Sequence, residues 1–447
     1  MILSELKQII KADKEKKKDK YYARRYYNYK PNRYFPDTGL TYEESYADRN
    51  GKIVTVERDR KTFMYTNYAK LLINQKVDYI LGQLPTMEDI KNYDNIEVAD
   101  LLEDMTLTAA LDVRAWVFLY YYKNEIKHVL IPDKQIIDKY DEYNNLIEVL
   151  RYYDQKDEKD KLITYVEIWT LNGVEKYSYR EDGEDFLTCE VLNHYNKEQY
   201  YNKELVSKES YNFDFIPFIC MINNKNMEND IESVKDLLDF YNIIKSGYVD
   251  NILKFQEALM KLRGFGGGDE FLKHTNEQMK KYKLLALGDP DSDAEYMSVE
   301  IPVEARKVIL ESLNQNIFKI GQGMDVDQIG DGNITNIVIK NRYSALNMKA
   351  DKTIKQLKKF YKMFAACLNS VYKTNVSDEI VFNKSINWNE SEIIDNCVKS
   401  TGIISNKTII KNHPWTENVE DELRMIEDDT LKNTQMYQQS ENNFNKE

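Results

Sequence analysis

A run of apolar and aromatic residues in the middle of the chain alternates between spacings of three and four positions. This spacing predicts one helix over residues 229–262, roughly 48 Å long, with a single apolar stripe. Asn229 and Glu232 would form a capping box at its start. Because a helix cannot bury such a stripe by itself, we expect it to pack lengthwise against copies of itself or a partner helix. The alternative is an ordinary long core helix. The stripe consists of Ile231, Val234, Leu238, Tyr241, Lys245, Tyr248, Ile252, Phe255, Leu259 and Leu262.

A second helix with similar spacing is expected over residues 303–320, so the two helices should form an antiparallel pair. Between them, residues 263–302 read as a small module at the tip of the pair. A cluster of glycines begins this module and predicts a flexible hinge, not a phosphate loop, because it follows a helix and lacks a Gly-Lys-Ser/Thr sequence. These glycines are Gly264, Gly266, Gly267 and Gly268.

The segment 321–335 is rich in glycine and aspartate, which predicts a mobile, anionic loop. Its notable residues are Gly321, Gly323, Asp325, Asp327, Asp331, Gly332 and Asn333. A long helix is expected from 335 to 372, with Lys352, Lys355 and Lys359 along one face. These lysines would either contact DNA or form a solvated face, and the second reading is favoured. The polar tail 431–447 is expected to be disordered.

In the N-terminal half, residue spacing predicts helices over 67–81 and 98–110. An antiparallel meander is expected over 113–191, with a hairpin at Asn172-Gly173.

A lysine cluster at 14–18 precedes a Tyr/Arg run at 21–29. Such a pattern suits a nucleic-acid patch. The favoured alternative is a solvated helix end followed by an arm that packs on a neighbour.

Composition and motifs argue against several classes of function. Lys and Arg number 62 and Asp and Glu 75, a net charge of -13 that argues against a surface built to clamp nucleic acid. No apolar run is long enough for a membrane span. No motif supports catalysis or a cofactor, and we expect neither. Asp325 and Asp327 form a pair that could hold a divalent cation, but the loop lacks the other ligands of a calcium site.

The order of these elements resembles the siphophage-type portal proteins of tailed phages that infect Gram-positive bacteria. One departure is Thr335-Asn336, which stands where the family usually has Ser-Gly. The resemblance covers residues 20–430 and is carried by an ordered set of motifs: residues 67–85, Phe215-Ile216-Pro217-Phe218 with Asn223-Asn224, residues 236–242 with Ser246 and Asp250, Ile317-Phe318, and residues 401–408 with Pro414-Trp415 and Glu422.

The resemblance implies an α+β fold with a β-rich and helical wing, two long stem helices, a small α/β clip, a tunnel loop, a long kinked helix and a small helical crown. The implied boundaries are an N-terminal arm at 1–60, wing at 61–228, stem helices at 229–262 and 303–320, clip at 263–302, tunnel loop at 321–335, returning helix at 336–374, crown at 375–430 and tail at 431–447.

It also implies a non-enzymatic ring of about twelve subunits at one capsid vertex of the virion, assembled in the host bacterial cytoplasm. Double-stranded DNA would pass through its channel during packaging and ejection. The implied partners are the terminase large subunit, the major capsid and scaffolding proteins, and a head-tail adaptor, with no membrane. Asp325, Asp327 and Asp331 would repel or guide DNA, and Lys245 would face the channel or set helix register. The alternatives are a helical scaffold or adaptor, and a metal-dependent nuclease using Asp325 and Asp327.

Overall fold

The chain divides into two compact units in the computed structural model. One unit comprises Met1–Asn74 and Met105–Gly323, and the other Gln75–Asp104 and Met324–Glu447. Two predicted helices, α3 (Tyr68–Leu81) and α4 (Asn95–Asp112), are confirmed and contribute residues to both units. The structure describes residues 2–28, 41–47, 53–59, 64–89, 93–123, 125–201, 204–255, 259–263, 274, 277, 293–297, 303–325, 335–386, 389–416 and 418–444.

Antiparallel sheets form the body of the first unit, which confirms the predicted meander. Five strands lie side by side in sequence order in the larger sheet, and three form the smaller. The larger sheet consists of β5 (Ile136–Tyr140), β6 (Leu146–Lys156), β7 (Leu162–Thr170), β8 (Gly173–Arg180) and β9 (Thr188–Leu192). The smaller has the order β12 (Phe218–Ile222), β3 (Arg114–Tyr122) and β4 (Glu125–Ile131), and the turn η2 (Asp133–Gln135) leads from β4 to β5. Two further hairpins pair β1 (Thr41–Ala47) with β2 (Ile53–Asp59), and β10 (Tyr195–Tyr201) with β11 (Glu204–Tyr211).

The hairpin predicted at Asn172-Gly173 joins β7 to β8, where Thr170 pairs with Gly173. Gly173 has a φ of +139°, a conformation that side chains disfavour. A Cβ atom at this position would also lie 2.5 Å from the carbonyl oxygen of Leu192 in β9. Glycine is therefore required here by backbone conformation and by the close approach of β9.

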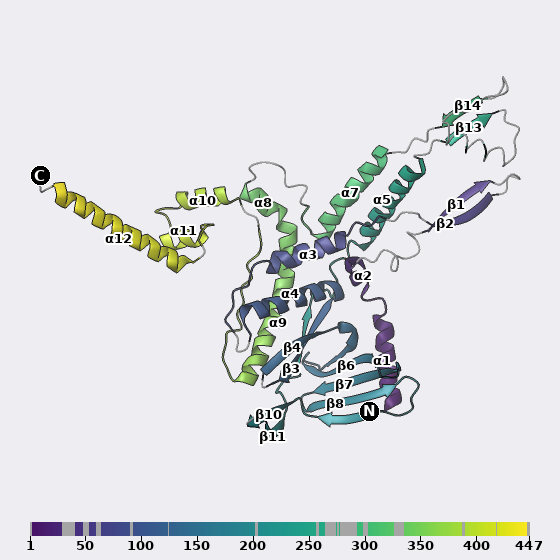
Figure 1. Cartoon of the computed structure of the whole chain (residues 1–447), viewed down its shortest axis with the longest axis horizontal. Coiled ribbons are helices and arrows are strands. Elements are labelled where there is room, and N and C mark those ends of the chain that lie inside the picture. Colours follow the sequence, from purple (N-terminus) through teal and green to yellow (C-terminus); the bar gives the residue numbers. More distant parts are fainter. Residues whose placement is uncertain are drawn as a thin grey trace. The chain divides into compact units, whose positions relative to one another are not determined.

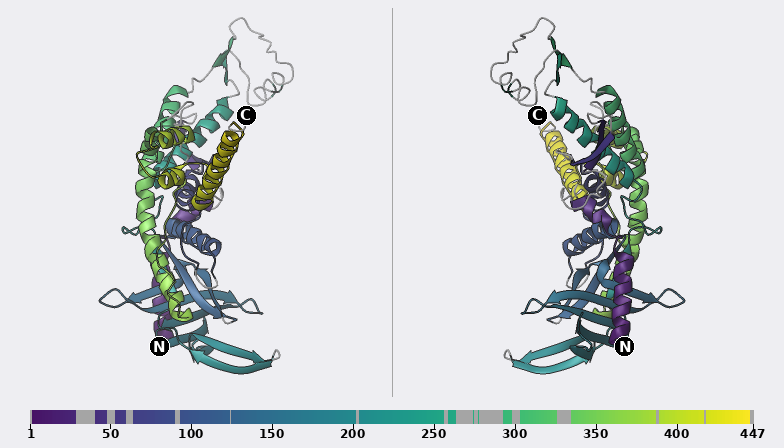
Figure 2. Two further views of the ribbon diagram at one scale, coloured as in Figure 1. Left: turned by 90° about the vertical axis from the view of Figure 1, so that its left-hand side faces the viewer. Right: turned by 90° about the vertical axis from the view of Figure 1, so that its right-hand side faces the viewer.

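Helix α1 (Leu3–Lys17) covers one face of the larger sheet (Figure 1 and Figure 2). Its buried residues Leu3, Leu6 and Ile10 repeat at helical spacing and pack on alternate residues of the strands. The strand residues in this core are Leu150, Tyr152, Val166, Ile168, Tyr177 and Tyr179. The opposite face packs on the smaller sheet around Trp116, Trp169 and Phe218. The unit therefore has a helix, a sheet and a second sheet in layers.

The helix predicted over 229–262 is shorter at both ends. Helix α5 runs over Lys235–Phe255, and Leu259–Arg263 forms strand β13, which pairs with β14 (Asp293–Met297). Pairing with a segment distant in sequence determines β13, and helical spacing of two leucines cannot reveal it. At the start, Asn229 Oδ1 accepts from the backbone N–H of Ile231 at 3.1 Å, so Asn229 closes a turn before the helix.

Helix α7 (Val303–Gly321) confirms the second predicted helix, and it packs beside α5 (Figure 1). The first unit also contains the short helix α2 (Tyr22–Asn28), which lies in the Tyr/Arg run.

The second unit is mainly helical. The long helix predicted over 335–372 is confirmed, with a break at Tyr343 that separates α8 (Asn336–Arg342) from α9 (Ser344–Tyr372). The apolar stripe of α9 includes the buried Leu357, Tyr361 and Phe364. Helix α9 is followed by α10 (Glu390–Lys399), α11 (Asn406–Asn412) and α12 (Val419–Phe444).

The expectation of a disordered tail at 431–447 is wrong, because α12 includes residues 431–444. This segment is polar but contains good helix formers such as Lys, Gln and Met. Its charges also support a helix, since Lys432 pairs with Asp429 one turn earlier at 3.6 Å.

Candidate functional site

The first residues of the predicted apolar stripe, in the turn before α5 and at its start, are buried inside the subunit. Ile231, Val234 and Leu238 are at most 1% exposed, and Tyr241 and Tyr248 are half-buried. The prediction that this stripe forms a seam between copies is therefore wrong for the first three residues, whose side chains are already covered. Helical spacing identifies the covered face of a helix but not what covers it. The side chains of Ile252, Phe255, Leu259 and Leu262 lie outside the described part.

Aromatic packing holds the α5–α7 pair against α3. The Tyr68 ring contacts Tyr241 of α5 and Phe318 of α7 edge-on, with centroid distances of 5.2 and 5.7 Å. Lys245 Nζ donates to Thr66 Oγ1 at 2.8 Å, so the one charged residue of the stripe binds within its own subunit. This contact favours a role in helix register over a position facing a channel.

The outer surface of the pair carries exposed apolar side chains. Phe240 of α5 is 58% exposed, and Val308 and Ile309 of α7 are 61% and 46% exposed. Val303 and Ile320 of α7 are also exposed, at 44% and 45%. Single exposed apolar residues are common, but several on one pair of helices are side chains that a partner could cover.

Helix α7 ends in a tight turn at the start of the predicted tunnel loop. Gln322 has a φ of 55°, and the Gly323 N–H donates to the Phe318 carbonyl at 3.0 Å, which is a Schellman-type ending. A Cβ atom on Gly321 would lie 2.8 Å from Leu72 Cδ1. Gly321 is therefore needed for close packing, and it is the last residue of the helix and not part of a mobile loop.

Beyond this turn, the backbone of Met324 is bound by a side chain of α3. Gln75 Nε2 donates to the Met324 carbonyl at 2.7 Å, and the Met324 N–H donates to Gln75 Oε1 at 3.0 Å. Met324 is buried, so these two bonds satisfy both of its backbone polar groups where water has little access. Asp325 follows directly.

The far end of the predicted loop is bound in a similar way. Asn389 N–H donates to Asn336 Oδ1 at 2.8 Å, and Asn336 Nδ2 donates to the Asn389 carbonyl at 3.3 Å. The backbone N–H of Asn336 donates to Glu392 Oε2 at 2.6 Å. Sequence reasoning noted Asn336 only as a departure from Ser-Gly and gave no sign of its partners.

Several predicted site residues fall outside the described residues. These are Asp327, Asp331, Gly332 and Asn333 of the predicted tunnel loop, and Gly264, Gly266, Gly267 and Gly268 of the predicted clip hinge. Lys352, Lys355 and Lys359 are exposed on α9. Within the part of the chain that the structure describes, no group of three or more His, Cys, Asp or Glu residues is placed to hold a metal ion.

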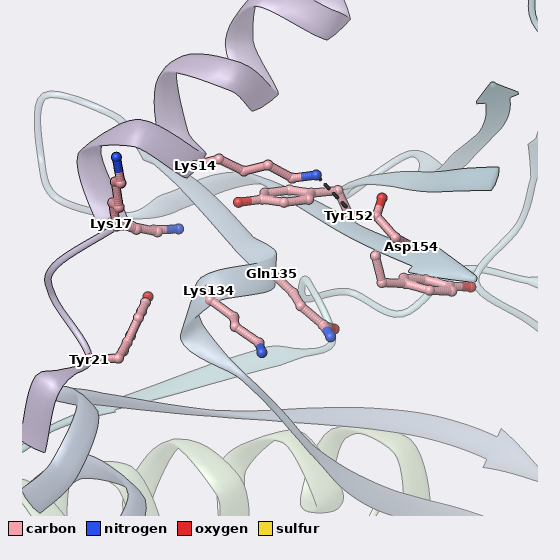
Figure 3. Close-up of a pocket in the computed structure, with 9 residues that line it drawn as sticks. Lys14, Lys17, Tyr21, Lys134, Gln135, Tyr152 and Asp154 are labelled. Carbon is pink, nitrogen blue, oxygen red and sulfur yellow. Dashed lines mark hydrogen bonds and ion pairs between the residues drawn. The ribbon is translucent and has the colours of Figure 1, made fainter. Parts of the chain in front are cut away.

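The N-terminal lysine cluster lines a pocket of about 460 Å³ at the end of α1. Figure 3 shows the Lys14 ammonium group beside the Tyr152 ring and directed at Asp154, which it contacts at 3.0 Å. Lys17 is buried and binds Asp13 at 2.7 Å. These pairings disfavour a nucleic-acid patch. They also differ from the expected solvated helix end, because Lys17 is buried and bound within its own subunit.

Asp133, in η2, is the centre of this buried network. Its carboxylate contacts Arg114 Nε at 2.8 Å and Lys20 Nζ at 2.7 Å, and it accepts from Tyr21 and from Trp116 Nε1. Burial raises the pKa of Asp133, but the neighbouring cations and hydrogen bonds outweigh it, and the pKa lies below its usual value. Nothing in the sequence indicated this residue, because its partners are distant along the chain.

One known protein family matches almost the whole chain. Residues 6–436 match the profile of the family described as "Phage portal protein, SPP1 Gp6-like". The chain belongs to this family. It is thus a phage portal protein, a structural protein of the capsid vertex in the virion.

Two curated relatives agree with this assignment. The chain is 27% identical to the portal protein of Clostridium phage phiCD119 over 472 aligned positions, covering 94% of each chain. It is 24% identical to the portal protein of Bacillus phage SPP1 over 404 positions, covering 85% of this chain and 78% of the relative.

A comparison with solved structures found chains of gene transfer agent (GTA) particles. One is described as "Neck of empty GTA particle computed with C6 symmetry", with a TM-score of 0.44, 11% identity, and coverage of 78% of this chain and 90% of that chain. A second is described as "Neck of native GTA particle computed with C12 symmetry", with a TM-score of 0.37, 10% identity, and coverage of 76% and 88%. Among the described residues, no helix has both the length and the apolar character needed to cross a bilayer.

Proposed function

We propose that the protein forms a closed ring of about twelve copies, through whose axial channel double-stranded DNA is packaged and later ejected. The observation that carries this proposal is the family match over residues 6–436. In this ring α5 and α7 form the stem, residues 263–302 the clip, residues 322–335 the tunnel loop and residues 375–430 the crown.

The exposed side chains of Phe240, Val308 and Ile309 support ring assembly. A head-to-tail interface that closes on itself covers such side chains in every copy and leaves none at an end. In the proposed ring, the buried Ile231, Val234 and Leu238 hold the subunit together, and the exposed side chains of the helix pair meet the neighbouring subunit.

The charge of the chain suits a channel that does not hold DNA. A cationic wall would bind the duplex by releasing counterions, whereas an anionic wall keeps affinity low. We assign Asp325, Asp327 and Asp331 to this wall. Lys352, Lys355 and Lys359 are candidates for weaker contacts with packaged DNA.

The remaining partners follow from what the ring would need. Packaging requires a motor that consumes ATP, and the sequence has no phosphate-binding loop, so the terminase large subunit must dock from outside. We assign this contact, and later the head-tail adaptor, to the clip. The major capsid and scaffolding proteins would bind the wing. We expect no enzymatic activity, and assembly in the cytoplasm of the host.

Negative-stain electron microscopy with native mass measurement tests this function. We expect rings of about a dozen copies with a central hole. Phe240→Asp and Val308→Asp should reduce ring formation, whereas Glu304→Asp, on an exposed position of α7, should not. A stable dimer or trimer without a hole would contradict the ring and favour a scaffold or adaptor. Magnesium-dependent turnover that is lost in Asp325→Asn and Asp327→Asn would favour a nuclease.

A further inference from the structure

We propose that Gln75 and Asn336 are the positioning residues of the tunnel loop, and that each fixes one end of it through a two-way bond between a side-chain amide and a backbone peptide. This inference rests on the proposed function, because it takes the segment between Met324 and Asn336 as a lining of the channel. Neither residue belongs to the loop motif that the sequence indicated.

The chemistry at the start of the loop requires a primary amide of one length. Gln75 both donates to and accepts from the backbone of Met324, as a neighbouring β-strand would. Glutamate could accept from the Met324 N–H but could not donate to its carbonyl, and asparagine is one methylene shorter. Since Met324 is buried, loss of Gln75 leaves two backbone groups without partners in a site with little water.

At the end of the loop, the N-termini of α8 and α10 bind each other through hydrogen bonds. Asn389 is the N-cap of α10 and accepts from the Glu392 N–H, while its own peptide pairs with the Asn336 side chain. Glu392 in turn accepts the backbone N–H of Asn336, at the start of α8, where the Thr335 side chain makes no cap. A carboxylate beside a helix N-terminus is also favoured by the helix dipole.

This arrangement explains why Thr335-Asn336 can replace Ser-Gly. Glycine has no side chain and could make neither bond to Asn389. Both pairs of contacts lie within the second unit, and each joins parts that are distant in sequence. Gln75 is 249 positions from Met324, and Asn336 is 53 positions from Asn389. A displacement of α10 would therefore reach the loop through Asn336, and a displacement of α3 would reach it through Gln75.

The test compares the full-length protein with Gln75→Ala, Gln75→Glu and Asn336→Ala. Gln83→Ala and Asn396→Ala serve as matched controls, because both side chains are exposed. Gln83 lies just after α3, and Asn396 lies on α10. Amide hydrogen exchange is measured at Met324 and Asn389. We expect about tenfold faster exchange at Met324 in Gln75→Ala and at Asn389 in Asn336→Ala, because each loses one hydrogen bond.

Gln75→Glu separates positioning from general stability. Its carboxylate still accepts from Met324, so the exchange rate of that amide should stay near that of the wild type while the bond to the carbonyl is lost. We expect rings of Gln75→Ala and Asn336→Ala to form but to give fewer DNA-filled capsids, and the two controls to match the wild type in both measurements.

Two results would overturn the inference: wild-type exchange at Met324 in Gln75→Ala, or wild-type yields of DNA-filled capsids from both alanine variants. A stable dimer or trimer of the wild type without a central hole would instead overturn the proposed function. Exchange at Met324 and Asn389 would still decide whether the two amide pairs exist.

Discussion

The hydroxyl of Tyr26, in the short helix α2, lies 2.8 Å from both carboxylate oxygens of Asp239 in α5. The preceding turn repeats this contact, since the Tyr22 hydroxyl donates to Glu232. Burial raises the pKa of Asp239, and the hydrogen bond from Tyr26 opposes that effect. The Tyr/Arg run therefore binds α5 and the turn before it in its own subunit through these two hydroxyls.

Replacing Tyr26 by Phe should weaken the attachment of α5. The change removes the donor to a partly buried carboxylate, and we expect the free energy of unfolding to fall by about 1–3 kcal/mol. Denaturant unfolding measures this change. Tyr143→Phe is the control, because Tyr143 is 77% exposed, and an equal loss in both variants would contradict a specific role for the contact.

Replacing Asp133 by Asn should destabilise the first unit strongly. The carboxylate is fully buried and binds Arg114 and Lys20, and removing one partner of a buried ion pair costs about 3–5 kcal/mol. Thermal unfolding at neutral pH would measure this loss.

The same residue predicts sensitivity to acid. Because the pKa of Asp133 is lower in the folded state, its contribution is fully present above the unfolded value of about 3.9 and is lost as pH falls through the folded value. Melting temperatures from pH 6 to pH 2 should therefore fall more steeply for the wild type than for Asp133→Asn. Parallel curves would show that another carboxylate dominates.

Two positions on α5 distinguish the inside of the subunit from its outer surface. Leu238→Ala should lower the free energy of unfolding by about 2–5 kcal/mol, because it opens a cavity in a packed core. Phe240→Ala should change it by less than about 0.5 kcal/mol while reducing ring formation, since its side chain is exposed. Chemical unfolding and electron microscopy of both variants provide the test, and a reversed pattern would place the interface on the other side of the helix.

His194 should make the first unit sensitive to mildly acidic pH. The Phe213 N–H donates to Nδ1 at 3.0 Å and Nε2 lies 2.7 Å from the Thr170 carbonyl, so the proton sits on Nε2 and the ring is neutral. Burial lowers the pKa of His194. The unfolded chain thus takes up the proton first, and stability should fall as pH drops below about 6.5.

Melting temperatures between pH 8 and pH 5 measure this effect, and Trp169 fluorescence reports it locally because the two ring centroids are 5.6 Å apart. His194→Gln should lose the pH dependence in this range. If the variant kept it, another group would be responsible.

Periodic elements could be predicted from the sequence, but their surroundings could not. The meander, α7 and α9 follow from residue spacing, because each buries one regular face. The ends of α5 could not be predicted, since β13 depends on β14, which lies about thirty residues further along the chain. The Gln75–Met324 contact has no local signal at all, because neither residue is unusual in its own segment.

The paired N-termini of α8 and α10 also limit how the chain can change in length. If one residue were inserted between Thr335 and Asn336, the new residue would occupy the place of Asn336 at the start of α8. The Asn336 amide would then point about 100° further around the helix axis and could not bind Asn389. Related chains should therefore keep a constant length at the start of α8.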